Sequence, residues 1–305
     1  MDNTIYKDAR KQFSRIGLVL FLGTLLISAV QIGAIEVASG IAILAGNKDL
    51  LFLSYMLPMY LIAFPLTFLL FRCVPAKQQK EKKTMSLKDF FSSFLITYSG
   101  GYLFAVVANL LIYLIGILKQ NPVNNVLMDT LTGIHPATTF LLTVICAPLF
   151  EELLFRKMLI DRISNYGEGV SVFFSGFIFG LFHGNLSQFC YAFFLGSFLA
   201  FIYCKTKNIL YPIILHLLFN FFNGFLSLQI MGREEDTITL LYSCLIICAV
   251  ISGLVIFLVN KKKFIFTEGE FPLEKGRRFT TIFLNPGVLL FCIFWIGIII
   301  YQLLM

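Results

Sequence analysis

Six polar residues lie in strongly apolar stretches of the chain, and their types are those that carry out hydrolytic chemistry. They are Glu151, Glu152, Arg156, His183, His216 and Asn220. A charged side chain at the centre of a bilayer costs about 2.5–3.5 kcal/mol on insertion scales, so residues of this kind need partners and a purpose. A carboxylate, two imidazoles and an amide are the parts needed to hydrolyse an amide bond without a serine or cysteine nucleophile. We therefore predict that these residues form an active site.

The spacing of these residues assigns them to helix faces. Side chains four positions apart share one face of a helix, whereas adjacent side chains diverge by about 100°. Glu152 and Arg156 are therefore expected to pair, which leaves Glu151 free to point into the bundle. His216 and Asn220 repeat the four-residue spacing.

The two segments that carry Glu151 and His183 are expected to form an antiparallel hairpin. Its turn is centred near residue 167, sixteen residues from each side chain, so the two residues should lie at similar depth. Pro148 lacks a backbone N–H and is expected to loosen the first helix next to a cavity. The hairpin therefore allows the carboxylate and the imidazole to meet.

The expected reaction assigns one role to each polar group. Glu151, desolvated in the bundle, takes a proton from water, and His183 aids or orients that water. His216 and Asn220 donate hydrogen bonds to the tetrahedral oxyanion in a setting of low dielectric constant. The leaving amine recovers the proton through Glu151.

The elements that must position these residues are membrane-spanning helices. The chain is 58% hydrophobic and only 13% charged, and its apolar segments approach or exceed the roughly 20 residues that a helix needs to cross the hydrocarbon. The predicted fold class is all-α, a polytopic transmembrane helical bundle of about eight to nine spans in a single domain, 1–305, with the catalytic core at 138–228. We place the spans at residues 16–43, 50–73, 89–118, 138–160, 170–186, 188–204, 209–228, 237–260 and 281–304.

The basic residues predict a cytoplasmic N-terminus. If the N-terminus is cytoplasmic, all but three of the 24 basic residues fall in inner segments, and the exceptions are Lys48, Lys119 and Arg233. The net charge of +7 is then explained by topology, so we expect the lipid bilayer as a partner and no nucleic acid. The seven cysteines lie in or beside apolar segments and are expected to be free thiols.

Three strings of the sequence resemble the signature of the CAAX protease and bacteriocin-processing family (CPBP, or Abi), which includes the Ras-converting prenyl endopeptidases. They are Ala147-Pro-Leu-Phe-Glu-Glu-Leu-Leu-Phe-Arg156, Phe179-Gly-Leu-Phe-His183, and the segment 202–220 that ends in His216-Leu-Leu-Phe-Asn220. The resemblance covers roughly residues 138–228. One departure is Lys157, where relatives commonly have glycine after the arginine.

The resemblance implies an integral-membrane endopeptidase whose active site opens toward the cytoplasmic side. It gives Glu151 the role of base and His183 that of its partner. It makes His216 and Asn220 the oxyanion donors, and it gives Glu152 and Arg156 a supporting role. The expected location is a bacterial plasma membrane, because frequent Phe, Ile and Lys fit an AT-rich bacterial genome. The expected substrate is a peptide precursor or membrane-associated protein, as in bacteriocin processing.

Three alternatives stay open at this point. In a zinc-dependent version of the same protease, Glu151, His183 and His216 would bind the metal with a water in the fourth place. We favour a reaction without a cofactor, because the chain lacks the His-Glu-x-x-His spacing. A proton-coupled transporter also uses Glu and His inside spans, but it often shows inverted repeats, and the polar residues here are confined to one block. A non-catalytic bacteriocin-immunity protein would tolerate loss of the polar set.

Overall fold

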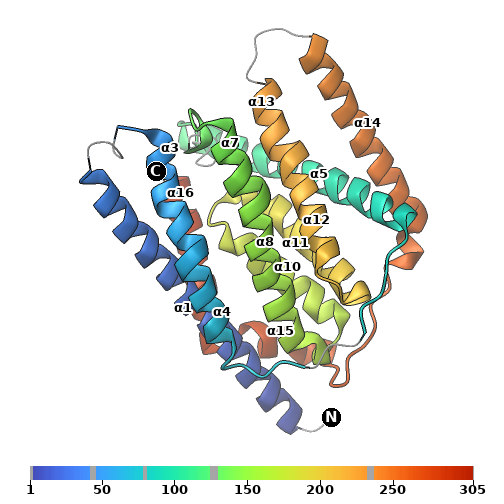
Figure 1. Ribbon diagram of the computed structural model, residues 1–305. Coiled ribbons are helices and arrows are strands. Elements are labelled where there is room, and N and C mark those ends of the chain that lie inside the picture. Colours follow the sequence, from blue (N-terminus) through green and yellow to red (C-terminus); the bar gives the residue numbers. More distant parts are fainter. Residues whose placement is uncertain (1–2, 42–45, 78–80, 124–129, 232–236, 305) are drawn as a thin grey trace.

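The protein is a bundle of long apolar helices in the computed structural model, which describes residues 3–41, 46–77, 81–123, 130–231 and 237–304 (Figure 1). Among these residues, eight helices are long and apolar enough to cross a membrane, and a ninth apolar helix is shorter. The prediction of an all-helical polytopic bundle is therefore confirmed.

Several spans are composites of α-helix and wider π-helical turns. The second span joins α3 (Lys48–Pro58) to α4 (Phe64–Phe71) through a π-helical segment. The fourth joins α7 (Pro136–Thr139), α8 (Ala147–Glu152) and α9 (Leu159–Ile163) in the same way. The remaining helices are α1 (Asn3–Ser39), α5 (Leu87–Lys119), α10 (Glu168–Phe182), α11 (Leu186–Thr206), α12 (Leu210–Phe219) with α13 (Ser227–Met231), α14 (Thr237–Asn260), α15 (Lys275–Phe283) and α16 (Pro286–Leu304).

The prediction of a full span at 170–186 is wrong in length. Helix α10 has 15 residues, so it is about 22 Å long against a hydrocarbon thickness of about 30 Å. It ends because Gly184 adopts a left-handed conformation with φ of 67°, and the Asn185 side chain then accepts the backbone N–H of Gln188 to begin α11. His183 is thereby placed at a turn inside the bundle.

The predicted span 281–304 is also divided. Helix α15 ends at Phe283, and α16 begins after Asn285, whose side chain accepts the backbone N–H of Val288. Of α15 and α16, only α16 is a candidate membrane span. At the other terminus, α1 begins at Asn3 and not near residue 16.

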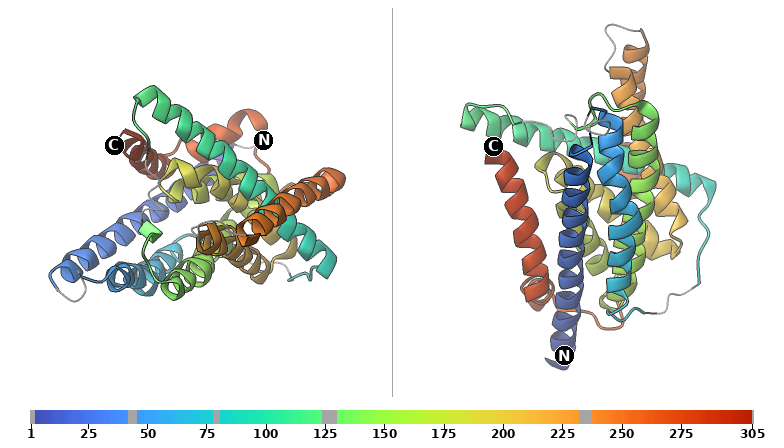
Figure 2. Two further views of the ribbon diagram at one scale, coloured as in Figure 1. Left: turned by 90° about the horizontal axis from the view of Figure 1, so that it is seen from above. Right: turned by 60° about the vertical axis from the view of Figure 1, so that its left-hand side comes forward.

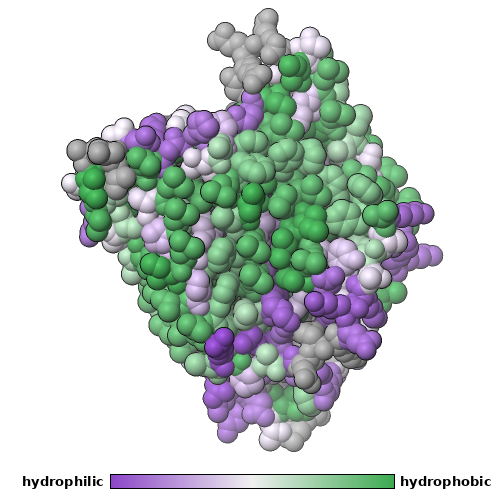
Figure 3. Space-filling view, viewed as in Figure 1, coloured by the Kyte–Doolittle hydropathy of each residue, from purple (hydrophilic) through white to green (hydrophobic). Residues whose placement is uncertain are grey.

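Helices α10 and α11 lie in the middle of the bundle, with α8 and α12 beside them, and α5 crosses behind at a steep angle (Figures 1 and 2). A broad apolar surface separates two polar margins (Figure 3). Such a surface suits contact with lipid chains. The starts of α3 and α7 and the end of α13 lie at one end of the bundle, whereas the N-terminus and α15 lie at the other (Figure 1).

Two of the basic residues used to predict orientation, Lys80 and Arg233, lie outside the described residues.

Candidate active site

The helix that carries both glutamates is widened just before them by Pro148. In the π-helical segment that precedes α8, the backbone N–H of Ala147 donates to the carbonyl of Leu142, five residues back. The next carbonyl, that of Thr143, then faces Pro148, which has no N–H to donate. A buried carbonyl needs a donor from elsewhere, and the Asn220 amide supplies one at 2.8 Å from Nδ2 to oxygen. Pro148 thus explains why Asn220 contacts the backbone of the helix that carries the glutamates. The two residues in contact, Thr143 and Asn220, are 77 positions apart in the sequence.

Glu152 and Arg156 form the ion pair expected from their spacing. Arg156 Nε lies 2.8 Å from Glu152 Oε2, and both side chains are fully buried. The guanidinium also lies 4.6 Å above the centre of the Phe179 ring, a cation–π contact. The arginine therefore both balances the glutamate and packs against the helix of His183.

The second oxygen of Glu152 holds His216. Its Oε1 lies 2.9 Å from His216 Nδ1, so the imidazole donates through Nδ1–H to the carboxylate. This contact joins helices that are 64 residues apart in sequence, and the spacing rules do not predict it. The other ring nitrogen, Nε2, is left for the cavity, 3.9 Å from Glu151 Oε2.

His183 is held by its own helix. Its Nδ1 lies 2.8 Å from the carbonyl oxygen of Phe179. A carbonyl only accepts hydrogen bonds, so Nδ1 carries the proton, and Nε2 of the neutral ring is an acceptor. The Phe179 ring packs edge to face against both imidazoles, with centroids 4.8 Å from His183 and 5.7 Å from His216.

A cavity of about 410 Å³ brings four of the predicted residues together. Its lining includes Glu151, His183, His216 and Asn220. Glu152 and Arg156 do not line the cavity but lie behind its wall, where Glu152 holds His216 and Arg156 pairs with Glu152. The side chain of Glu151 is 16% exposed and lies beside His216. A water molecule or a carbonyl group inside this cavity would therefore meet a carboxylate, two imidazoles and an amide.

The second span also lines the cavity, which sequence reasoning missed. Met56, Met59, Tyr60 and Phe64 contribute to its wall, together with Gln188 and Tyr191 of α11. The predicted core at 138–228 therefore lacks one wall of the site. No residue type in this span signals a role, because methionine and aromatic side chains are ordinary in apolar helices.

The zinc alternative would need Glu151, His183 and His216 as ligands. Among the described residues, no group of three His, Cys, Asp or Glu side chains is placed to hold a metal ion. His216 directs Nδ1 at Glu152, and His183 directs Nδ1 at a backbone carbonyl, so each has one nitrogen left for the cavity.

Comparisons with known proteins agree with the sequence resemblance. Residues 133–222 match the family described as "Type II CAAX prenyl endopeptidase Rce1-like". The chain is also 25% identical over 179 residues to the Bacillus subtilis (strain 168) protein named "Putative membrane peptidase YdiL", covering 56% of this chain and 70% of that protein. No solved structure matches. The matched family segment contains all six predicted site residues, and the two findings support a membrane protease.

Proposed function

We propose that this relative of the type II CAAX prenyl endopeptidases is an intramembrane endopeptidase that hydrolyses a peptide bond with a water activated by Glu151. One observation carries the proposal: Glu151, His183, His216 and Asn220, from three separate helical segments, line one cavity. In a soluble protein such a cluster is unremarkable, but in membrane-spanning helices polar side chains are costly unless they serve a function.

The activation of water is assigned to Glu151 and His183. Glu151 is the base that accepts the proton of the attacking water. The neutral His183 ring has its acceptor at Nε2, so it can hold the second hydrogen of the same water. After attack on the carbonyl carbon, Glu151 returns its proton to the leaving amine, and the C–N bond breaks to give a carboxylic acid and an amine.

The oxyanion is assigned to His216 and Asn220. Because His216 already donates through Nδ1, it can donate to an oxyanion only from a protonated Nε2, as an imidazolium. The Asn220 amide has two N–H groups and uses one on Thr143, which leaves the other for the oxyanion.

The test compares the wild-type protein with Glu151→Gln in the cells that make it. Mass spectrometry of membrane and secreted peptides should show an uncut precursor that accumulates in the variant, while the protein amount and its melting in detergent stay unchanged. Identical peptide profiles with a folded variant would refute the protease. Loss of proton-coupled transport without a change in peptides would favour the transporter, and an unchanged immunity phenotype would favour a non-catalytic role.

Metal dependence is tested separately on purified protein. We expect activity to survive exhaustive treatment with a chelator, because the proposed reaction uses only side chains and water. Loss of activity on depletion, with recovery by stoichiometric zinc, would select the zinc alternative. The substrate that we propose is a peptide precursor or membrane-associated protein of a bacterial plasma membrane, and a precursor found by the first experiment would identify it.

A further inference from the structure

The cavity runs from Glu151 toward one end of the bundle only. On the fourth span its lining residues are Glu151, Ala147, Thr143 and Thr139, a stripe at four-residue spacing that leads back to the start of α7. No lining residue follows Glu151 on this span. The lining therefore covers three successive turns of this span, from Glu151 toward the start of α7.

The other two walls run the same way. On α12 and α13 the lining begins at His216 and ends at Leu228, the second residue of α13. On the second span it runs from Phe64 back to Met56, toward the start of α3. Leu131, which precedes α7, completes the wall. The starts of α3 and α7 and the end of α13 lie at the same end of the bundle (Figure 1).

On the wall that α12 begins, burial is greatest beside His216 and decreases toward the other end. At the floor, Leu195, His216 and Phe219 are each no more than 2% exposed, whereas Gly224 near the opposite end is exposed. A Cβ added at Gly224 would meet nothing within 4 Å. Below the floor, the buried Glu152–Arg156 pair and the fully buried Phe155 close the way to the other end. The cavity thus has a mouth at one end and a sealed floor at the other.

The two ends differ in charge. The sealed end bears the N-terminal segment of α1, the chain between α4 and α5, the turn after α11 and the segment from Lys261 to Arg278. These segments hold most of the basic residues of the chain, whereas Lys48 and Lys119 are the basic residues that the structure describes at the end with the mouth. Basic loops stay on the cytoplasmic side of a membrane.

We propose that the active-site cavity opens to the extracytoplasmic side, so that the substrate is an apolar segment of an exported or membrane-anchored polypeptide. This inference rests on the proposed protease function. It reverses the cytoplasmic opening that the family resemblance implies. The wall disfavours a charged substrate segment. Among the lining residues that the structure describes, the titratable side chains are Glu151, the two histidines, Tyr60 and Tyr191. Met56, Met59, Phe225 and Leu228 line the way to the mouth, together with the uncharged side chains of Thr139, Thr143 and Asn223. A charged segment would lose its hydration there without gaining a partner.

The side of the mouth is tested by cysteine labelling, which does not depend on catalysis. In a variant whose seven cysteines are replaced, Gly224→Cys places a thiol at the mouth and Lys207→Cys places one at the sealed end. A membrane-impermeant, charged maleimide added to intact cells should label position 224 to the same extent as after permeabilisation. Position 207 should be labelled only after permeabilisation. Any other pattern overturns the proposal, including protection of both positions in intact cells.

The location of the cut is tested on the peptides that differ between wild-type protein and Glu151→Gln. We expect the cleaved sites to map to extracytoplasmic segments or to the outer half of membrane anchors. Sites in cytoplasmic segments would overturn the inference and leave the protease intact. If no peptide differs, the protease proposal fails, while the labelling result still decides on which side the cavity opens.

Discussion

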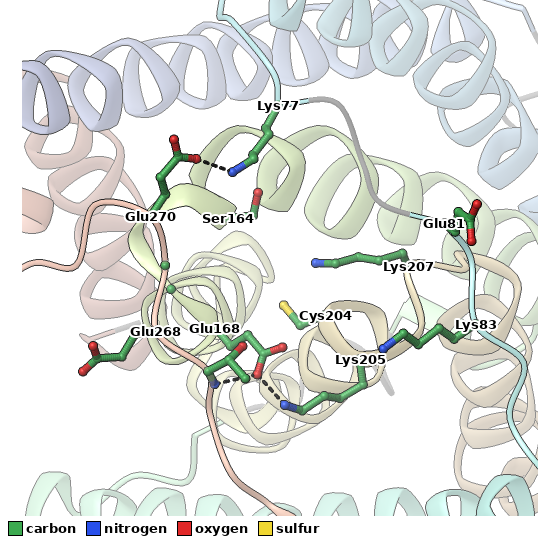
Figure 4. A pocket seen from close by; sticks show the side chains of 13 residues that line it. Lys77, Glu81, Lys83, Ser164, Glu168, Cys204, Lys205, Lys207, Glu268 and Glu270 are labelled. Carbon is green, nitrogen blue, oxygen red and sulfur yellow. Dashed lines mark hydrogen bonds and ion pairs between the residues drawn. The ribbon is translucent and has the colours of Figure 1, made fainter.

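Two hollows of the molecule hold charged side chains in opposite ways. The active-site cavity has a few polar groups in an apolar wall, and the ion pair of Glu152 with Arg156 behind that wall is fully buried. The pocket at the basic end has about 530 Å³ and a lining rich in lysine and glutamate (Figure 4). There Lys77 pairs with Glu270, and these side chains are 38% and 57% exposed. Lys205 pairs with Glu168 in the same pocket.

The two hollows differ in how far water screens their charged side chains. At the basic end, solvent screens each pair. Behind the wall of the apolar cavity, Glu152 and Arg156 depend on each other, because both side chains are fully buried in the protein. Charge in the first hollow therefore orients the protein in the membrane, whereas charge in the second holds the proposed catalytic groups in place.

The largest expected effect in the apolar cavity is that of Glu151→Gln on cleavage. Removing a general base lowers the rate by about 10²–10⁴-fold. With a substrate from the peptide comparison, kcat should fall while the melting temperature in detergent stays within error of wild type. A variant that keeps wild-type kcat would assign the base to another residue.

The next effect concerns stability and sharpens the comparison of ion pairs. Arg156→Met keeps the packing on Phe179 but leaves the buried Glu152 without its cation, which costs about 3–5 kcal/mol in the free energy of unfolding. Denaturant titration in detergent measures the loss. Arg156→Lys retains a charge and should recover part of it. Equal stability of Arg156→Met and wild type would show that water reaches this pair.

A third effect separates chemistry from binding. Asn220→Ala removes a proposed oxyanion donor and should lower kcat by about 10²–10³-fold with little change in KM. The matched control is Asn223→Ala, since Asn223 lines the same cavity but has no assigned contact with the reacting atoms. A similar fall in both variants would mean that the cavity wall, and not the amide of Asn220, matters.

The smallest effect is expected at the basic end. Lys205→Ala removes a partner of Glu168 from a partly exposed pair, and such pairs contribute about 1 kcal/mol or less. The loss should shrink further at high salt, because solvent ions screen the pair. A loss as large as that of Arg156→Met, unaffected by salt, would remove the distinction between the two hollows.

Much of the fold was predictable because it depends on local sequence. Spans follow from apolar length, and the predicted pairing of Glu152 with Arg156 follows from helix periodicity. The prediction for 170–186 was too long because composition alone does not reveal where a turn is placed: Gly184 and Asn185 end the helix inside an apolar run. The contribution of the second span to the cavity wall was also not predicted, because its apolar side chains do not differ in type from those that face lipid or the protein core.

By itself the sequence determined which residues are polar within apolar helices, how they share helix faces and which end of the bundle is basic. All of these depend on neighbours within a few positions or on a count of charges. Only the tertiary structure decided that Glu152 holds His216, that Asn220 satisfies the Thr143 carbonyl freed by Pro148, and that the cavity has its mouth at the end opposite the basic loops. The two hydrogen bonds join segments that are 64 and 77 residues apart. Their geometry depends on how whole helices pack against each other, and the periodicity of a single helix holds no information on that packing.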